Sequence, residues 1–86
     1  MELKMYTIYD VKTKAYHKPF YSNTNGAAIR AFSNAVNDPV SDFNKNPEDY
    51  TLFEIGHYND TEGTLHPLEV KIPLGTALEM IKERTK

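Results

Sequence analysis

Three lysines alternate with three aromatic residues and a histidine between positions 12 and 21. The lysines are Lys12, Lys14 and Lys18, and the rings are those of Tyr16, His17, Phe20 and Tyr21. This mixture suits single-stranded nucleic acid. Lysine ammonium groups neutralise phosphates, while flat rings stack on unpaired bases at about 1–3 kcal/mol per base. The segment therefore predicts a nucleic-acid-binding surface.

Arg30 extends the candidate surface, because it lies on a predicted helix away from the apolar stripe of that helix. It could contact a phosphate or form an exposed salt bridge. The predicted nucleic-acid-binding residues are Lys12, Lys14, Tyr16, Lys18, Phe20 and Arg30. A structural interpretation stays open, in which the rings pack in the core or in a dimer interface. The lysines would then keep an edge strand from pairing with other chains.

Residues that could catalyse a reaction or hold a metal ion are scattered along the chain. His17, His57 and His66 are isolated, and the four glycines form no phosphate-binding loop. Glu48 and Asp49 form a local acidic pair, which is typical of a solvated loop. We therefore expect no enzymatic activity, no cofactor and no metal. An enzyme remains an option only if the fold gathers distant carboxylates and histidines in a pocket.

The length of 86 residues predicts a single domain, residues 1–86. A domain of this size buries only about 60% of the surface of its unfolded chain, so we expect a homo-oligomer, with a dimer favoured. The chain has no cysteine, which excludes a disulfide scaffold. No apolar run approaches the roughly 18 residues of a membrane span, and residues 1–4 lead into a strand-like pattern rather than a signal peptide. We expect no membrane association.

Charge is unevenly distributed between the two halves of the chain. Residues 1–36 hold five basic and two acidic side chains, a net charge of +3, whereas residues 37–86 hold five basic and ten acidic ones, a net charge of −5. The total of −2 argues against a protein that coats nucleic acid with its whole surface. Any contact with phosphates must therefore use a restricted basic patch, and the acidic half could bind another protein.

Alternation and turn residues predict the elements of the first half. Residues 2–10 carry apolar side chains on both faces and predict a central strand. Residues 15–21 predict a second strand, which Pro19 confines to an edge or interrupts. Thr24 is a good N-cap for a helix over residues 25–37, whose apolar stripe comprises Ala28, Ile29, Phe32, Ala35 and Val36.

In the second half, residues 38–49 predict a long irregular connection that Phe43 pins to the core. Residues 50–58 predict the strongest strand, and residues 59–63 a hairpin loop in which Gly63 takes a positive φ. Residues 64–72 predict a returning strand with Leu68, Val70 and Ile72 on its buried face. A final helix is predicted from the spacing of Leu74, Ala77, Leu78 and Ile81, with Pro73 near its start and Lys82, Arg84 and Lys86 at its C-terminal end.

These elements predict an α+β domain of order ββαββα. Each helix has one apolar stripe that must be covered. The simplest arrangement is a four-stranded, mainly antiparallel sheet with both helices packed on one face. The other face of the sheet would then be open to solvent, a ligand or a second copy.

Two phrases of the sequence are unusual and resemble a known family. They are residues 25–39 (NGAAIRAFSNAVNDP) and residues 46–56 (NPEDYTLFEIG), and residues 6–10 (YTIYD) and 74–78 (LGTAL) fit the same pattern. Together they resemble the small nonstructural, DNA-binding protein of gokushovirus-type phages, members of the Microviridae. The resemblance covers nearly the whole chain.

The resemblance implies a non-catalytic phage protein of the host cytoplasm that binds DNA. Its expected role is in viral genome replication, in the switch to single-stranded genome synthesis, or in packaging. No catalytic or nucleotide-contact residues come with the family. Two hypotheses follow: a single-stranded DNA binder, or a module that binds a phage replication or capsid protein or a host factor.

Overall fold

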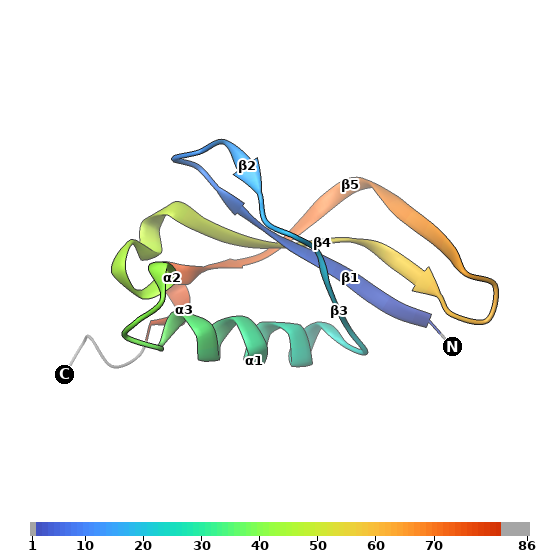
Figure 1. The fold of residues 1–86 in the computed structure, drawn as a ribbon, viewed down its shortest axis with the longest axis horizontal. Coiled ribbons are helices and arrows are strands. Elements are labelled where there is room, and N and C mark those ends of the chain that lie inside the picture. Colours follow the sequence, from blue (N-terminus) through green and yellow to red (C-terminus); the bar gives the residue numbers. More distant parts are fainter. Residues whose placement is uncertain (1, 82–86) are drawn as a thin grey trace.

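The computed structural model describes residues 2–81, which form one antiparallel sheet with the helices on one of its faces (Figure 1). The strands are β1 (Glu2–Asp10), β2 (Ala15–Tyr16), β3 (Phe20–Ser22), β4 (Tyr50–Asn59) and β5 (Thr64–Thr76). Strand β1 is central, since it pairs with β2 and β3 along one edge and with β4 along the other, and β5 lies beyond β4. The predicted fold class is confirmed.

Strand β1 has buried residues on both faces, as its sequence predicts. Tyr6 and Ile8 are buried toward the helices, while Met5 and Thr7 are buried on the opposite face. The predicted second strand is split into β2 and β3, and Pro19 lies between them. Proline has no N–H to donate to a neighbouring strand, which explains the interruption.

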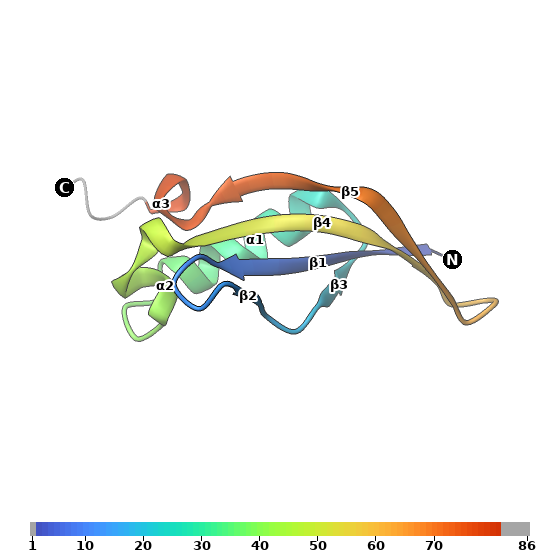
Figure 2. The same cartoon turned by 90° about the horizontal axis from the view of Figure 1, so that it is seen from above.

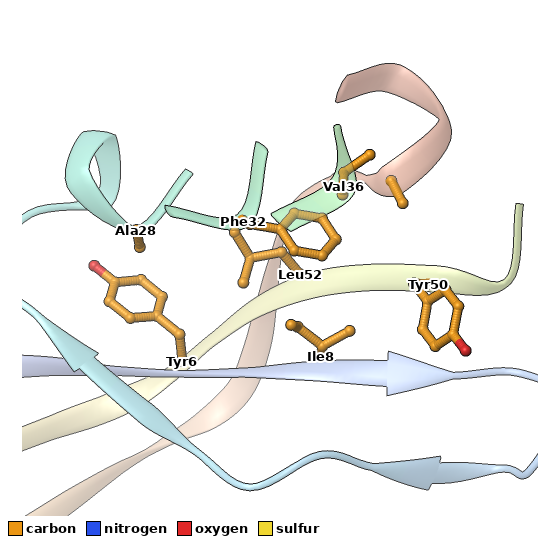
Figure 3. Close-up of a cluster of buried hydrophobic side chains, with 8 residues drawn as sticks. Tyr6, Ile8, Ala28, Phe32, Val36, Tyr50 and Leu52 are labelled. Carbon is orange, nitrogen blue, oxygen red and sulfur yellow. The ribbon is translucent and has the colours of Figure 1, made fainter. Parts of the chain in front are cut away.

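Helix α1 (Asn25–Val36) supplies the helical side of the core. It begins as predicted, because the Thr24 hydroxyl accepts a hydrogen bond from the backbone N–H of Ala27 at 3.1 Å. Its residues Ala28, Phe32 and Val36, spaced four apart, are buried. Figure 3 shows these side chains facing the sheet residues Tyr6, Ile8, Tyr50 and Leu52.

The predicted irregular connection is wrong in part, because it contains two short helical segments. These are α2 (Asp42–Lys45) and the 3₁₀ helix η1 (Pro47–Asp49). Ser41 caps α2 by accepting a hydrogen bond from the backbone N–H of Asn44 at 3.2 Å. The prediction for Phe43 is confirmed, since its ring lies 4.8 Å from the ring of Tyr50 and 5.6 Å from that of Phe32.

The predicted end of the second half is also wrong. Strand β5 continues to Thr76, so that Pro73 lies within it, and helix α3 (Ala77–Met80) has only four residues. An edge strand tolerates proline, and Thr76 with Glu79 forms a capping box that fixes the late start of the helix. Lys82, Arg84 and Lys86, which we predicted to complement the helix dipole, lie outside the described residues.

Strand β5 does not have the buried apolar face that its alternation predicts. Val70 is 77% exposed and Ile72 is 44% exposed. The cause is the register with β4, which pairs Gly56 with Pro67 and Glu54 with Ile72, and pairs no β4 residue with residues 68–71. This part of β5 arches away from β4 on the side opposite α1 (Figure 1). The helices therefore cannot cover it.

Candidate nucleic-acid interface

Figure 2 views the sheet from the side opposite α1. Side chains on this face line a trough. Its floor comprises Met5 and Thr7 from β1 and Ile55 from β4. One wall is the edge formed by Tyr16, His17 and Pro19, and the other is the arch of β5, with Pro67, Leu68 and Lys71. The trough has a volume of about 410 Å³. It is the open sheet face that the sequence predicts, but with raised sides.

A hydrogen bond holds the Tyr16 wall in place. The Thr7 hydroxyl is buried and donates to the backbone carbonyl of His17 at 2.7 Å. The backbone N–H of His17 in turn donates to the carbonyl of Ile8 at 2.8 Å. The chain after β2 is therefore fixed to the central strand although regular pairing has ended there.

Tyr16 is the central ring of an aromatic platform at one end of the trough. Its ring centroid lies 4.6 Å from that of Tyr9 and 6.3 Å from that of Phe53. The Lys71 ammonium lies 5.3 Å from the centroid of the Tyr16 ring, within the range of a cation–π interaction. Tyr16 is still 48% exposed. The ring is thus oriented by its neighbours and remains accessible to a ligand.

Lys12, Lys14 and Lys18 lie in the segments just before and just after β2, the strand that carries Tyr16, and all three are exposed. A tight turn carries the first two. In it the Asp10 carboxylate accepts from the N–H of Lys12 at 2.9 Å, the Asp10 carbonyl accepts from the N–H of Lys14 at 2.8 Å, and Lys14 takes a φ of 57°. Within residues 2–81 no carboxylate forms an ion pair with any of the three lysines. No carboxylate of the described residues therefore neutralises their charges.

The other two predicted residues lie elsewhere. The Phe20 ring stacks on Tyr6 at 5.5 Å and packs against the core on the helix side of the sheet. Arg30 is exposed on α1, on the far side of the molecule from the trough. Lys12, Lys14, Tyr16 and Lys18 thus belong to β2 and the segments that flank it, whereas Phe20 and Arg30 lie elsewhere.

Three residues of the platform were missed from the sequence. Tyr9 alternates with the core residues of β1, so its position opposite Tyr16 could have been derived from a correct strand register. Phe53 and Lys71 belong to β4 and β5, and no local pattern links them to residues 12–21. Only the antiparallel pairing of β1 with β4 and the arch of β5 bring them near Tyr16.

Two of the histidines and the buried tyrosines lie outside the platform. His57 and His66 stack at 4.8 Å across β4 and β5, although they are distant in sequence, and His57 lies 3.6 Å from the Glu2 carboxylate. Burial, and to a lesser extent Glu54, raises the pKa of Tyr6. Burial also raises the pKa of Tyr50, helped by neighbouring carboxylates.

The described part of the chain offers neither a metal site nor a membrane-spanning helix. Residues 2–81 contain no cluster of three or more histidine, cysteine or acidic side chains that could hold a metal ion. No helix in this range has the length and apolar character needed to cross a membrane.

The fold and the site together define a class: a small α+β domain with one helical layer and an open sheet face that carries an aromatic platform, with lysines in the flanking segments that pair with no carboxylate within residues 2–81. The chain belongs to the Phage ORF5 protein family, whose model matches residues 3–80. This bears out the resemblance in its coarser form, a small phage protein. Searches of curated proteins and of solved structures find no match.

Proposed function

We propose that this phage protein binds single-stranded DNA along the trough and takes part, without catalysis, in viral genome replication or packaging. The switch to single-stranded genome synthesis in the host cytoplasm is the step that the likeness to the gokushovirus protein suggests. Membership of a phage family supports a viral role. The observation that carries the proposal is the half-exposed, oriented ring of Tyr16 among lysines that have no carboxylate partner within residues 2–81.

The mechanism is occupancy of an unpaired strand. A base would stack on Tyr16, since every base offers a flat face to an aromatic ring. Lys12, Lys14 and Lys18 would neutralise the neighbouring phosphates, and Lys71 would turn from the ring to a phosphate as the base enters. A duplex offers no unstacked base to this platform, so we expect single strands to bind more tightly.

Fluorescence anisotropy with single- and double-stranded oligonucleotides over a salt series tests the proposal. Four neutralised phosphates predict a slope of log affinity against log salt of roughly −3 on single strands. Replacing Lys12, Lys14 and Lys18 together by Gln should reduce the slope to roughly −1. Arg30→Gln is the matched control on the other side of the molecule and should leave the slope unchanged.

Replacing the stacking ring gives a second, independent measurement. Tyr16→Ala should weaken binding by about 5- to 150-fold, whereas Tyr16→Phe, which keeps the ring, should bind nearly as well as the wild type. Undetectable binding at low ionic strength, or affinity that does not fall with salt, contradicts the proposal.

A second candidate function is a protein-interaction module for a phage replication or capsid protein or a host factor. The apolar floor and far wall of the trough favour it, because Met5, Ile55, Pro67 and Leu68 offer little to a phosphate backbone. In that case a phage or host protein co-purifies, nucleic acid does not compete, and the triple lysine variant retains the partner. Retention of an added oligonucleotide instead identifies DNA as the ligand.

A further inference from the structure

Strand β5 presents a long unpaired edge. It has 13 residues and pairs only with β4, so its outer side has no strand partner among residues 2–81. Figure 2 shows the middle of β5 at the margin of the sheet, with no other described element beyond it. Leu65, Val70 and Ile72 are large apolar residues exposed on this strand. An exposed apolar edge of this length is a template for pairing with another strand.

The sequence of the arch is symmetric about Val70. Residues 67–73 read Pro67, Leu68, Glu69, Val70, Lys71, Ile72 and Pro73. Proline thus mirrors proline, a branched aliphatic residue mirrors another, and glutamate mirrors lysine. An antiparallel pair of identical strands centred on Val70 places each residue opposite its mirror position. Every opposed pair within residues 68–72 would then be complementary.

We propose that two copies of this protein pair their β5 edges antiparallel around a two-fold axis at Val70. Glu69 of one chain then lies opposite the partner's Lys71, and the symmetry repeats this pair on the other side of the axis. Val70 packs against the partner's Val70, and Leu68 against the partner's Ile72. The partner is a second copy because the complementarity lies within one segment and needs no other sequence.

Charge fixes the register of this pairing. A two-fold axis perpendicular to the sheet keeps each side chain on its own face. The axis must therefore lie at a residue of β5 and not between two residues, so the alternative registers are centred on neighbouring residues. Centring on residue 69 would place two glutamates opposite each other, and centring on residue 71 would place two lysines opposite each other. Like charges directly opposite are destabilising. Only the Val70 centre pairs opposite charges.

The two prolines would limit the length of this pairing, and the arch between them would provide the paired residues. Pro67 and Pro73 would face each other at both ends, and neither has an N–H to extend the hydrogen-bond ladder. The ladder is thereby limited to residues 68–72. Four of these five residues have no partner in the register with β4. The backbone groups on the outer edge of β5, which point away from β4, have no strand partner among residues 2–81 and can pair with a second copy, since polar backbone groups require partners or water.

Light scattering and sedimentation of the full chain over a concentration series, without DNA, test the proposal. Glu69→Lys and Lys71→Glu each convert both symmetric pairs into like charges and should weaken the dimer at least about tenfold. The double variant restores opposite charges with the order exchanged, and should dimerise like the wild type. An equimolar mixture of the two single variants should form the heterodimer.

Two controls separate this interface from general effects of charge. Glu48→Lys lies on η1 and changes the net charge as Glu69→Lys does, so it should leave the dimer intact. Circular dichroism confirms that each variant is folded. A wild-type protein that is monomeric at all concentrations, or a dimer that both single variants leave unchanged, overturns the proposal. Either result leaves the single-stranded DNA proposal unaffected, because no nucleic acid is present.

Discussion

Gly56 lies where β4 meets the start of the β5 arch, and the structure leaves no room for a methyl group at this position. A Cβ atom at this position would lie 2.5 Å from the His66 carbonyl oxygen and 2.9 Å from the Pro67 Cα. Both contacts are backbone atoms of the strand paired with Gly56, so no side-chain rotation can relieve them. Ordinary contact is near 3.5 Å, so Gly56→Ala must displace β5 by about 1 Å.

Overpacking of this kind lowers the free energy of unfolding by about 1–3 kcal/mol. In a domain of this size the loss corresponds to a fall in Tm of roughly 5–20 °C. Thermal unfolding followed by circular dichroism measures it. The matched control is Gly26→Ala in the first turn of α1, where the nearest atom to the new Cβ lies at 3.9 Å. This control should be neutral or slightly stabilising, because alanine favours helix. Equal stability of the two variants would refute the close approach of β5 to Gly56.

Two further predictions concern the buried polar groups. Folding raises the pKa of Tyr50, so its contribution to stability is complete below about pH 10 and is lost as pH rises through the folded-state pKa. Tyr50→Phe should shift alkaline unfolding to higher pH, as followed by circular dichroism, and an unshifted midpoint argues against this origin. Thr7→Val removes the hydrogen bond to the His17 carbonyl and should lower the free energy of unfolding by about 1 kcal/mol. Amide exchange should become faster at residues 15–18, and unchanged protection there would show that the hydroxyl does not hold the wall.

Local signals were sufficient where an element is determined by its own residues. Strand β1, the N-cap Thr24, the buried stripe of α1 and the positive φ of Gly63 all follow from periodicity and side-chain chemistry within a few positions. The same applies to the lysines around Tyr16, which are neighbours in sequence before they are neighbours in space. The basic part of the candidate site was therefore predictable.

Local signals failed where long-range pairing decides the structure. The spacing of Leu74, Ala77, Leu78 and Ile81 is helical, yet pairing with β4 keeps the chain extended through Thr76. The alternation of Leu68, Val70 and Ile72 is that of a half-buried strand, but the change in register with β4 leaves two of them exposed. The alternation of β5 is thus genuine, but the core of the same chain does not cover Val70 and Ile72.

Phe20 and Tyr16 illustrate why the sequence alone could not tell which rings of the aromatic segment face the core and which face the trough. Both rings lie in the same lysine-rich stretch, but Pro19 interrupts the strand between them, so that counting alternate positions no longer tells which face each ring takes. Pairing with β1 decides the matter: Tyr16 lies opposite Tyr9 and Phe20 lies opposite Tyr6, and these two β1 residues face opposite sides of the sheet.

Two buried residues position the walls of the trough on the sheet face opposite the helices. Thr7 and Gly56 are buried there, one holding the Tyr16 wall and the other admitting the start of the β5 arch. The two sides of the trough are thus set by separate contacts to the two central strands. Tyr16 and Lys71 come from these opposite sides, and the Lys71 Nζ lies 5.3 Å from the centroid of the Tyr16 ring. A ligand held between them would therefore be sensitive to changes at Thr7 and at Gly56, although neither residue needs to contact it. Binding that survives both substitutions in folded protein would place the ligand outside the trough.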